Sequence, residues 1–330
     1  MEFEFIIDKI YLLLKMISNR KNLEELNRWK HEIIANILDS KVIEEIEARK
    51  ADIEEYFIRG EFEQMVRNNT LDSKIDEIFQ DVLFNKYYNE TLAYFNSLQD
   101  NWLNNKEKIN SWLKETIKLN PSQKITPVYV SHPTLNTGKC VDQQYIFWGH
   151  YKGIKDINYN LTYLCHENLH SLLPNANFMP PTIKLYYDKE SNISFQEHWK
   201  NLNSSIENYY QIFDFEFDMI HAVIELISDN ELYTILSKES KYKEGHNNPD
   251  FSLVKYKKLI FPYWFAYLGL SSREIHERVP EFNDENMELI PKENIIDIEK
   301  FIEFLINNAD IRTKLEVPDL PSSKLNHWCV

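Results

Sequence analysis

Glycine is scarce in this chain, and its scarcity limits the possible folds more than any other feature of the sequence. Only 6 of the 330 residues are glycine, beside 12 prolines. Glycine supplies the left-handed backbone conformations on which many tight turns depend. Leucine, glutamate and lysine, which favour helices, are abundant. We therefore expect long helices, few tight turns and a mainly α protein.

Hydrophobicity and charge narrow the class of protein. Hydrophobic residues make up 43% of the chain, which is enough for one large core or two of ordinary size. The net charge of −15 repels phosphate backbones and gives no basic face for an anionic membrane. We therefore expect neither a nucleic acid nor a membrane as a partner.

The N-terminal run MEFEFIIDKIYLLLKMI is apolar, but Glu2, Glu4 and Asp8 stand where a signal peptide would carry positive charge. No uninterrupted apolar stretch reaches membrane-spanning length. The 3 cysteines are odd in number and widely spaced, which fits reduced thiols better than a disulfide framework. These features predict a cytoplasmic protein.

The pattern of apolar residues changes near residue 120. From residue 2 to about 118, apolar residues recur at intervals of three and four, as in Leu71, Ile75, Ile78 and Val82, and this spacing is typical of amphipathic helices. We expect residues 1–120 to form a helical bundle or cap domain that covers or narrows a cleft. Residues 121–330 would form a second domain.

The second half mixes strand and helix patterns. Strands are predicted at ITPVYV (125–130), as an edge strand at best because of Pro127, at 144–153 and at 182–188. Helices are predicted around residues 161–172, 205–238, 251–269, 272–279 (with a capping box of Ser271 and Glu274) and 293–308. The expected fold class is mainly α with a small β-sheet (α+β).

Residues 161–174 read LTYLCHENLHSLLP and contain the pattern H-E-x-x-H. On a helix, residues four apart share a face, so His166 and His170 can bind one metal ion. Glu167 would then lie beside the open coordination position, where it can act as a base. The pattern arises by chance in roughly a few per cent of such sequences, so it does not establish a metal site by itself. A third ligand must be found elsewhere in the chain.

The segment IELISDN (224–230) offers that ligand as E-x-x-S-D, in which Glu225 and Asp229 share a helix face. With the H-E-x-x-H pattern, this segment resembles the gluzincin metallopeptidases, whose thermolysin-like members carry E-x-x-S-D and whose neprilysin-like members carry E-x-x-A-D. The 54 residues between His170 and Glu225 are closer to the neprilysin-like spacing.

The resemblance implies a zincin-like catalytic domain that holds Zn²⁺ through His166, His170 and Glu225. Asp229 would orient a ligand histidine. It further implies a zinc metallopeptidase that hydrolyses a peptide or protein substrate with a zinc-activated water, with Glu167 as general base.

The resemblance also implies an oxyanion donor and a substrate-binding edge strand. The donor would be a histidine downstream of the third ligand, for which His276, flanked by Arg273 and Arg278, is the candidate. Gluzincins pair an extended substrate with an edge strand that precedes the motif helix, and Tyr145 to Gly149 are the candidate here. A core strand with buried aromatic residues is an equal alternative.

Two alternatives remain open. His221 lies four residues before Glu225 on the same helix face, so it is either close to the metal or a hydrogen-bonded structural histidine. The whole protein could also be a non-catalytic peptide- or protein-binding module with a structural zinc site. Glu167 favours an enzyme, because a structural site does not need this residue.

Overall fold

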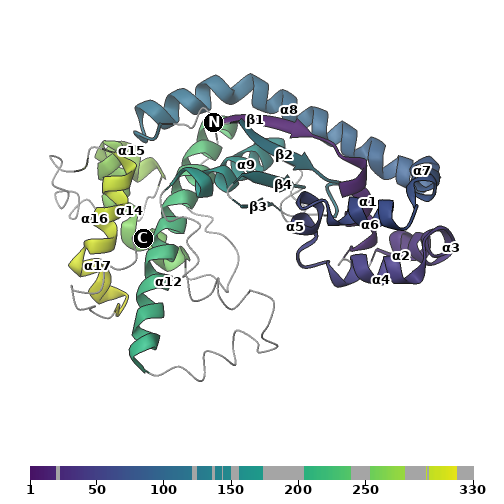
Figure 1. Ribbon diagram of the computed structural model, residues 1–330. Helices are drawn as coiled ribbons and strands as arrows, with labels where there is room; N and C mark the ends of the chain where they lie inside the picture. Colours follow the sequence, from purple (N-terminus) through teal and green to yellow (C-terminus); the bar gives the residue numbers. More distant parts are fainter. Residues whose placement is uncertain are drawn as a thin grey trace. The chain divides into compact units, whose positions relative to one another are not determined.

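The computed structural model describes residues 1–19, 23–120, 125–135, 138–142, 144–149, 156–173, 204–238, 253–278, 295 and 297–317, with backbone only at 204–214, 253–255 and 278. The described chain is mainly helical and carries one small sheet (Figure 1), which confirms the predicted fold class. It divides into two compact units. Unit 1 comprises Met1–Asn110 and Ser122–Asn168, and unit 2 comprises Ser111–Pro121 and Leu169–Val330.

The sheet belongs to unit 1 and explains why this division differs from the expected boundary at residue 120. Its strands are β1 (Glu2–Ile6), β2 (Ile125–Val130), β3 (Lys139–Val141) and β4 (Tyr145–Trp148), in the order β1-β2-β4-β3. β1 and β2 are parallel, β2 and β4 are parallel, and β3 is antiparallel to β4. The first residues of the chain therefore share a sheet with residues that follow position 120.

β1 corrects the prediction that the helical pattern begins at residue 2. Phe3 and Phe5 are buried whereas Glu4 is exposed, and this alternation is that of a strand with one buried face. The first helix, α1 (Lys9–Ile17), begins after Asp8, whose side chain accepts a hydrogen bond from the Tyr11 backbone N–H.

The predicted strand at 125–130 is confirmed as β2, but its expected edge position is wrong. β2 lies between β1 and β4. Pro127 is opposite Glu4 of β1, whereas the pairing with β4 begins only at Val128. The proline, which has no backbone N–H, thus precedes the part of β2 that is paired on both sides.

The predicted strand around Tyr145 is confirmed as β4, but it is not an edge strand either. β4 pairs with β2 on one side and with β3 on the other. Ile146, Phe147 and Trp148 are buried, as the alternative of a core strand required. Within the described residues, β3 forms this edge of the sheet.

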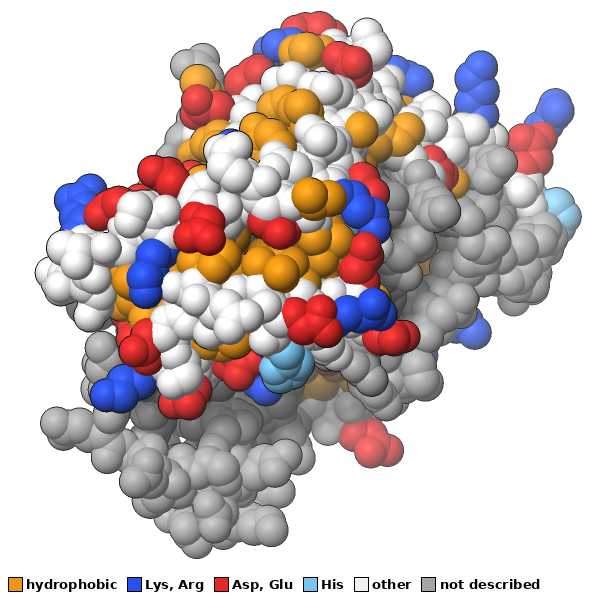
Figure 2. Space-filling model, turned by 90° about the vertical axis from the view of Figure 1, so that its right-hand side faces the viewer, with side chains coloured by type: hydrophobic (Ala, Val, Ile, Leu, Met, Phe, Trp, Pro, Cys, Tyr) orange, Lys and Arg blue, Asp and Glu red, His pale blue; other side chains and the backbone are white. Residues whose placement is uncertain are grey.

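After β1, the helices of unit 1 follow the helical pattern that was predicted from residue 2 to about 118. After α1 come short helices that gather at one end of this unit (Figure 1): α2 (Glu24–Trp29), η1 (Lys30–Ile34), α3 (Ala35–Ile37), α4 (Ser40–Ala48), α5 (Ile53–Ile58), α6 (Glu61–Asn68) and α7 (Asp72–Gln80). They enclose an apolar core that includes Trp29, Ile46 and Phe62. Figure 2 views this end and shows acidic and basic side chains interspersed around hydrophobic ones.

The long helix α8 (Val82–Glu115) supports the sheet and the motif helix α9 (Ile157–Leu172). The Trp102 ring lies 4.6 Å from the Phe3 ring of β1, measured between centroids. The Tyr94 hydroxyl lies 3.1 Å from Asn160 Oδ1, and Asn101 Nδ2 donates to the Ile157 carbonyl over 3.2 Å. Contacts from α8 therefore fix the first turns of α9.

Unit 2 is helical in its described part. Its elements are α12 (Ser204–Glu225), the π-helix η3 (Leu226–Leu232), α13 (Tyr233–Ser237), α14 (Leu253–Leu268), α15 (Ser272–Arg278), α16 (Ile298–Asn307) and α17 (Ala309–Lys314). α12 packs against α14 and α16. The predicted capping box is confirmed, because Glu274 Oε2 accepts from the Ser271 N–H over 2.8 Å. The predicted strand 182–188 lies outside the described residues.

Among the described residues, no helix combines the length and apolar character that crossing a membrane requires.

Candidate metal centre

The motif helix α9 is buried on nearly all sides. Leu161, Leu164, Cys165 and Leu169 are fully buried, and His166 is 2% exposed. A helix with such surroundings holds its side chains in fixed rotamers, because the interior is close-packed. α9 contains His166, Glu167 and His170, which confirms the prediction that H-E-x-x-H lies on a helix.

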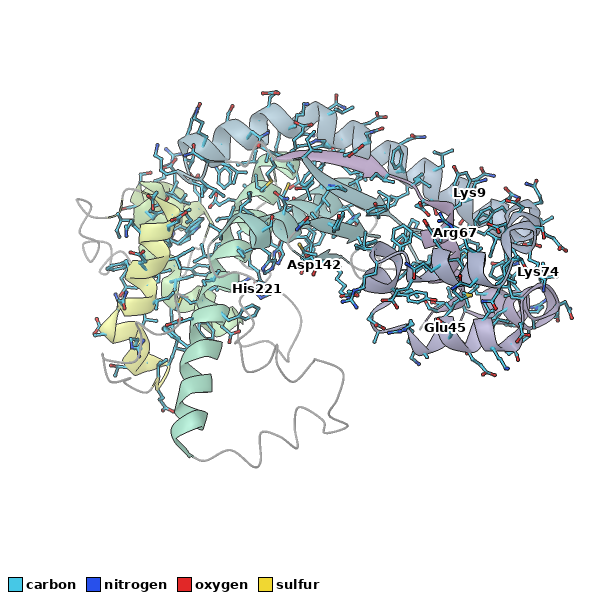
Figure 3. The ribbon with its side chains drawn as sticks, in the orientation of Figure 1. Lys9, Glu45, Arg67, Lys74, Asp142 and His221 are labelled. Atoms are coloured by element: carbon cyan, nitrogen blue, oxygen red, sulfur yellow. The ribbon has the colours of Figure 1, made fainter. Side chains whose placement is uncertain are left out.

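Three histidines converge at this helix. One ring nitrogen from each of His166, His170 and His221 lies within 4.8 Å of the others. His166 and His170 are one turn apart on α9, and His221 lies on α12 (Figure 3). The rings of His170 and His221 meet edge to face, with centroids 5.0 Å apart.

This group could hold a metal ion. Zn–N bonds of about 2.0–2.1 Å with tetrahedral angles would place the ligand nitrogens roughly 3.3 Å apart, which is inside the 4.8 Å within which the three nitrogens lie. Imidazole is a preferred zinc ligand, and three protein ligands leave the fourth position open, as catalytic zinc sites do.

Aromatic contacts hold two of the three rings. The Tyr163 ring stacks on the His166 ring at 4.7 Å with 6° between the planes. Phe217, one turn before His221 on α12, meets the His221 ring at 5.8 Å. Such packing lowers the entropy that the rings lose when they bind an ion. Tyr163 and His166 are three residues apart in the sequence, but this spacing does not by itself indicate that the tyrosine ring packs on the histidine ring.

Cys165 is not among the three converging residues. Its side chain is fully buried, burial raises the pKa of its thiol to about 12, and it packs as a small apolar group. Cys165 therefore belongs to the apolar interior around α9.

Glu167, the candidate base, is partly buried on α9. Its Oε1 atom lies 3.0 Å from the point where a Cβ atom on Gly138 would stand, directly before β3. The carboxylate thus lies beside the segment that leads into the edge strand.

Glu225, the expected third ligand, is not in the histidine group. Its carboxylate is 1% exposed and lies 2.9 Å from the Lys257 ammonium of α14. Instead, His221, one helical turn earlier on α12, lies beside the motif histidines. Asp229 is buried in η3 and accepts a hydrogen bond from the Ser228 hydroxyl over 3.2 Å. Nothing in the sequence indicated Lys257 as the partner of Glu225.

His276, the expected oxyanion donor, is exposed on α15. Its neighbour Arg273 forms a surface ion pair with Glu277 at 2.9 Å. The other histidines downstream of Glu225, His246 and His327, lie outside the described residues.

The chain was compared with protein-family models, with curated proteins and with solved structures, and no match was found in any of the three comparisons. The histidine group and the motif helix are therefore the basis for a functional assignment.

Proposed function

We propose that this protein is a zinc-dependent metallopeptidase whose described ligands are His166, His170 and His221 and whose general base is Glu167. The observation that carries this proposal is the convergence of three imidazole nitrogens around the helix that carries H-E-x-x-H. The glutamate favours an enzyme over a structural zinc site, because it is not one of the converging groups.

The donor set determines the chemistry that is available. A zinc ion held by three neutral imidazoles lowers the pKa of a water molecule and polarises a carbonyl group. Glu167 would accept the proton of the attacking water on its carboxylate and pass it to the leaving amine. The reaction would be hydrolysis of a peptide bond.

The edge strand of the sheet supports an extended peptide as substrate. β3 runs antiparallel to β4, and in the described residues its other side has no strand beside it. An extended peptide can add to such an edge through main-chain hydrogen bonds. Gly138 leads into β3 and lies against Glu167. A peptide paired to β3 would therefore pass the candidate base.

A reducing compartment such as the cytoplasm remains part of the proposal. Among the described residues, Cys140 and Cys165 form no disulfide bond, which supports this part of the proposal.

Metal analysis joined to cleavage of a peptide library tests the proposed function. We expect one tightly bound zinc ion per chain, peptide hydrolysis that stops on chelation, and recovery when Zn²⁺ is returned. Zinc binding without cleavage of any peptide would instead support a non-catalytic binding module. Full hydrolysis by the metal-free protein would contradict the proposal.

A further inference from the structure

Gly138 occupies a place where no side chain fits. Lys139 is opposite Phe147 in the β3–β4 pairing, so the preceding residue, Gly138, stands opposite Trp148. A Cβ atom on Gly138 would lie 2.4 Å from Trp148 Cζ3 and 2.9 Å from Cε3. It would also lie 3.0 Å from Glu167 Oε1. The indole ring and the carboxylate thus both approach the bare backbone of Gly138.

Trp148 cannot easily move away from this contact. Its side chain is fully buried, and its indole N–H donates to the Tyr94 hydroxyl over 2.8 Å. That hydroxyl belongs to α8 and also lies 3.2 Å from the Gly149 carbonyl. A buried indole with a satisfied N–H and close-packed neighbours has one favoured orientation.

The same indole also supports the metal-binding face of α9. The ring centroids of Trp148 and Tyr163 are 6.0 Å apart, and Tyr163 stacks in turn on the ring of His166. Trp148 therefore contacts Tyr163, which packs on His166, on one side, and the segment that carries Gly138 on the other.

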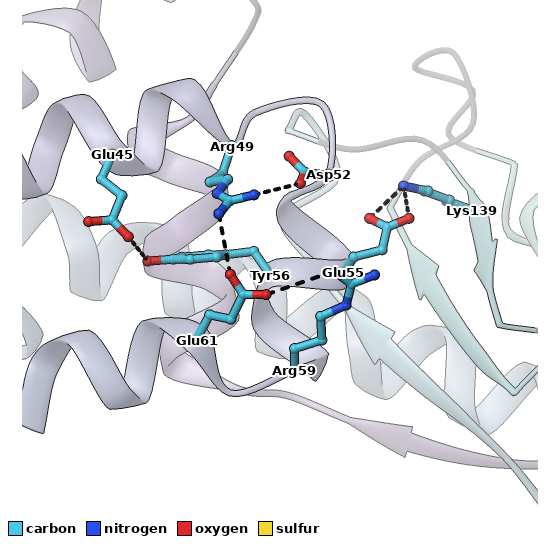
Figure 4. Close-up of polar contacts among 8 residues, drawn as sticks. All are labelled: Glu45, Arg49, Asp52, Glu55, Tyr56, Arg59, Glu61 and Lys139. Atoms are coloured by element: carbon cyan, nitrogen blue, oxygen red, sulfur yellow. Dashed lines mark hydrogen bonds and ion pairs between the residues drawn. The ribbon is translucent and has the colours of Figure 1, made fainter. Parts of the chain in front are cut away.

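The segment that carries Gly138 is held in place by an ion-pair clamp. The Lys139 ammonium lies 2.8 and 2.9 Å from the two carboxylate oxygens of Glu55 (Figure 4) and 3.5 Å from Glu54. Both glutamates belong to α5. Arg49 joins the neighbouring helices through Asp52 at 3.3 Å and Glu61 at 3.4 Å. A shift of β3 away from a larger residue at position 138 would therefore disturb the ion pairs between Lys139 and α5.

We propose that Gly138 is a positioning residue for Glu167. Because Gly138 has no side chain, the Trp148 ring and the Glu167 carboxylate can both lie close to the backbone before β3. This close packing determines the direction in which the carboxylate points. A methyl group at position 138 would lie closest to the held indole ring, so the backbone before β3 would have to shift, and the Glu167 carboxylate that lies beside this backbone would be displaced. This inference rests on the proposed peptidase function.

The test compares Gly138→Ala with the wild type by zinc content, steady-state kinetics on a cleaved library peptide, and a crystal structure of each protein. We expect equal zinc content, a kcat that is lower by roughly 10- to 100-fold, and a KM that changes less than about threefold. The crystal structure should show the Glu167 carboxylate displaced. A wild-type kcat in Gly138→Ala, or an undisplaced carboxylate, would overturn the inference.

Val128→Ile is the matched control. It adds one carbon to a fully buried position of β2, a strand of the same sheet outside the proposed substrate-binding edge, and should leave kcat within about twofold of the wild type. A loss as large as that of Gly138→Ala would mean that any disturbance of the sheet lowers activity, and would overturn a specific role for Gly138.

A second variant keeps the test decisive if Gly138→Ala fails to fold. Trp148→Leu removes the ring atoms that lie closest to position 138. The double variant Gly138→Ala/Trp148→Leu should fold and match the kcat of Trp148→Leu alone within about threefold. A further tenfold loss in the double variant would contradict the inference. If the wild type cleaves no peptide, the proposed function fails, whereas the crystallographic position of Glu167 still decides whether Gly138 sets it.

Discussion

Replacing Glu225 by glutamine separates its two candidate roles, ligand of the metal and ion-pair partner of Lys257. The Glu225 and Lys257 side chains are 1% and 5% exposed, and their charged atoms are 2.9 Å apart. Loss of one member of a buried pair costs about 3–5 kcal/mol, because the other charge stays buried. We therefore expect Glu225→Gln to lower the free energy of unfolding of the zinc-free protein by about 3 kcal/mol.

The double variant Glu225→Gln/Lys257→Met should recover most of this loss, because it removes both charges. Urea unfolding of the zinc-free proteins measures the effect. With an m-value of about 2–3 kcal/mol/M, the midpoint of Glu225→Gln should fall by about 1–1.5 M.

Zinc affinity, measured by competition with a chromophoric chelator, reports the other role of Glu225. If His221 is the third ligand, Glu225→Gln should weaken zinc binding less than about tenfold. His221→Ala should weaken it more than the roughly 10–100-fold typical of residues that only orient a ligand. A Glu225→Gln variant that unfolds like the wild type but loses its zinc would refute this reasoning and restore Glu225 as the ligand.

Three further predictions concern single side chains. Burial alone would raise the pKa of Glu54, but neighbouring ammonium groups, above all that of Lys15 at 2.8 Å, bring this pKa below its ordinary value of 4.5. Ionised Glu54 therefore stabilises the fold above the unfolded-state pKa, and this stability is lost as the pH falls through the folded-state pKa. Lys15→Met should cost about 3 kcal/mol at pH 7 and clearly less at pH 3, and an equal cost by urea unfolding at both pH values would contradict the ion pair. Asp229→Ala should weaken zinc binding about 10–100-fold in a chelator titration, whereas Ser228→Ala should change it little, and equal effects would remove the orienting role of Asp229. His276→Ala should leave the free energy of unfolding within about 0.5 kcal/mol, since the side chain is exposed. A kcat loss of about 10²-fold in this variant would identify the oxyanion donor, and a wild-type kcat would exclude His276 from that role.

Local patterns in the sequence predicted much of the fold, because helices are set by contacts between near neighbours. The helical period, the capping box of Ser271 and Glu274, and the placement of His166 and His170 on one helix all follow from spacings of three or four residues. The strands β2 and β4 were visible as runs bounded by prolines or polar residues.

The order of the strands could not be predicted in the same way. β1 pairs with residues more than 100 positions later in the chain. The short apolar run at the N-terminus, which directly precedes a helical pattern, does not indicate which later strand it pairs with. The interior position of Pro127 depends on where the pairing with β4 begins, which is a property of the assembled sheet.

The candidate site shows the same limit. His221 and Glu225 share a helix face, so the sequence allows either to approach the motif histidines. The buried contact between Glu225 and Lys257 distinguishes them, and Lys257 is 32 residues further along the chain. Gly138 likewise carries no local signal, because its importance comes from Trp148 and Glu167 on other elements.

The ratio of kcat between the wild type and Glu167→Gln, at equal zinc content, tests the central claim most directly. The substitution keeps the size of the side chain and removes its capacity to accept a proton. If Glu167 is the general base of a zinc peptidase, the variant should retain one zinc ion per chain and lose roughly three orders of magnitude or more in kcat. A Glu167→Gln variant that binds zinc and cleaves peptides as fast as the wild type would contradict the account.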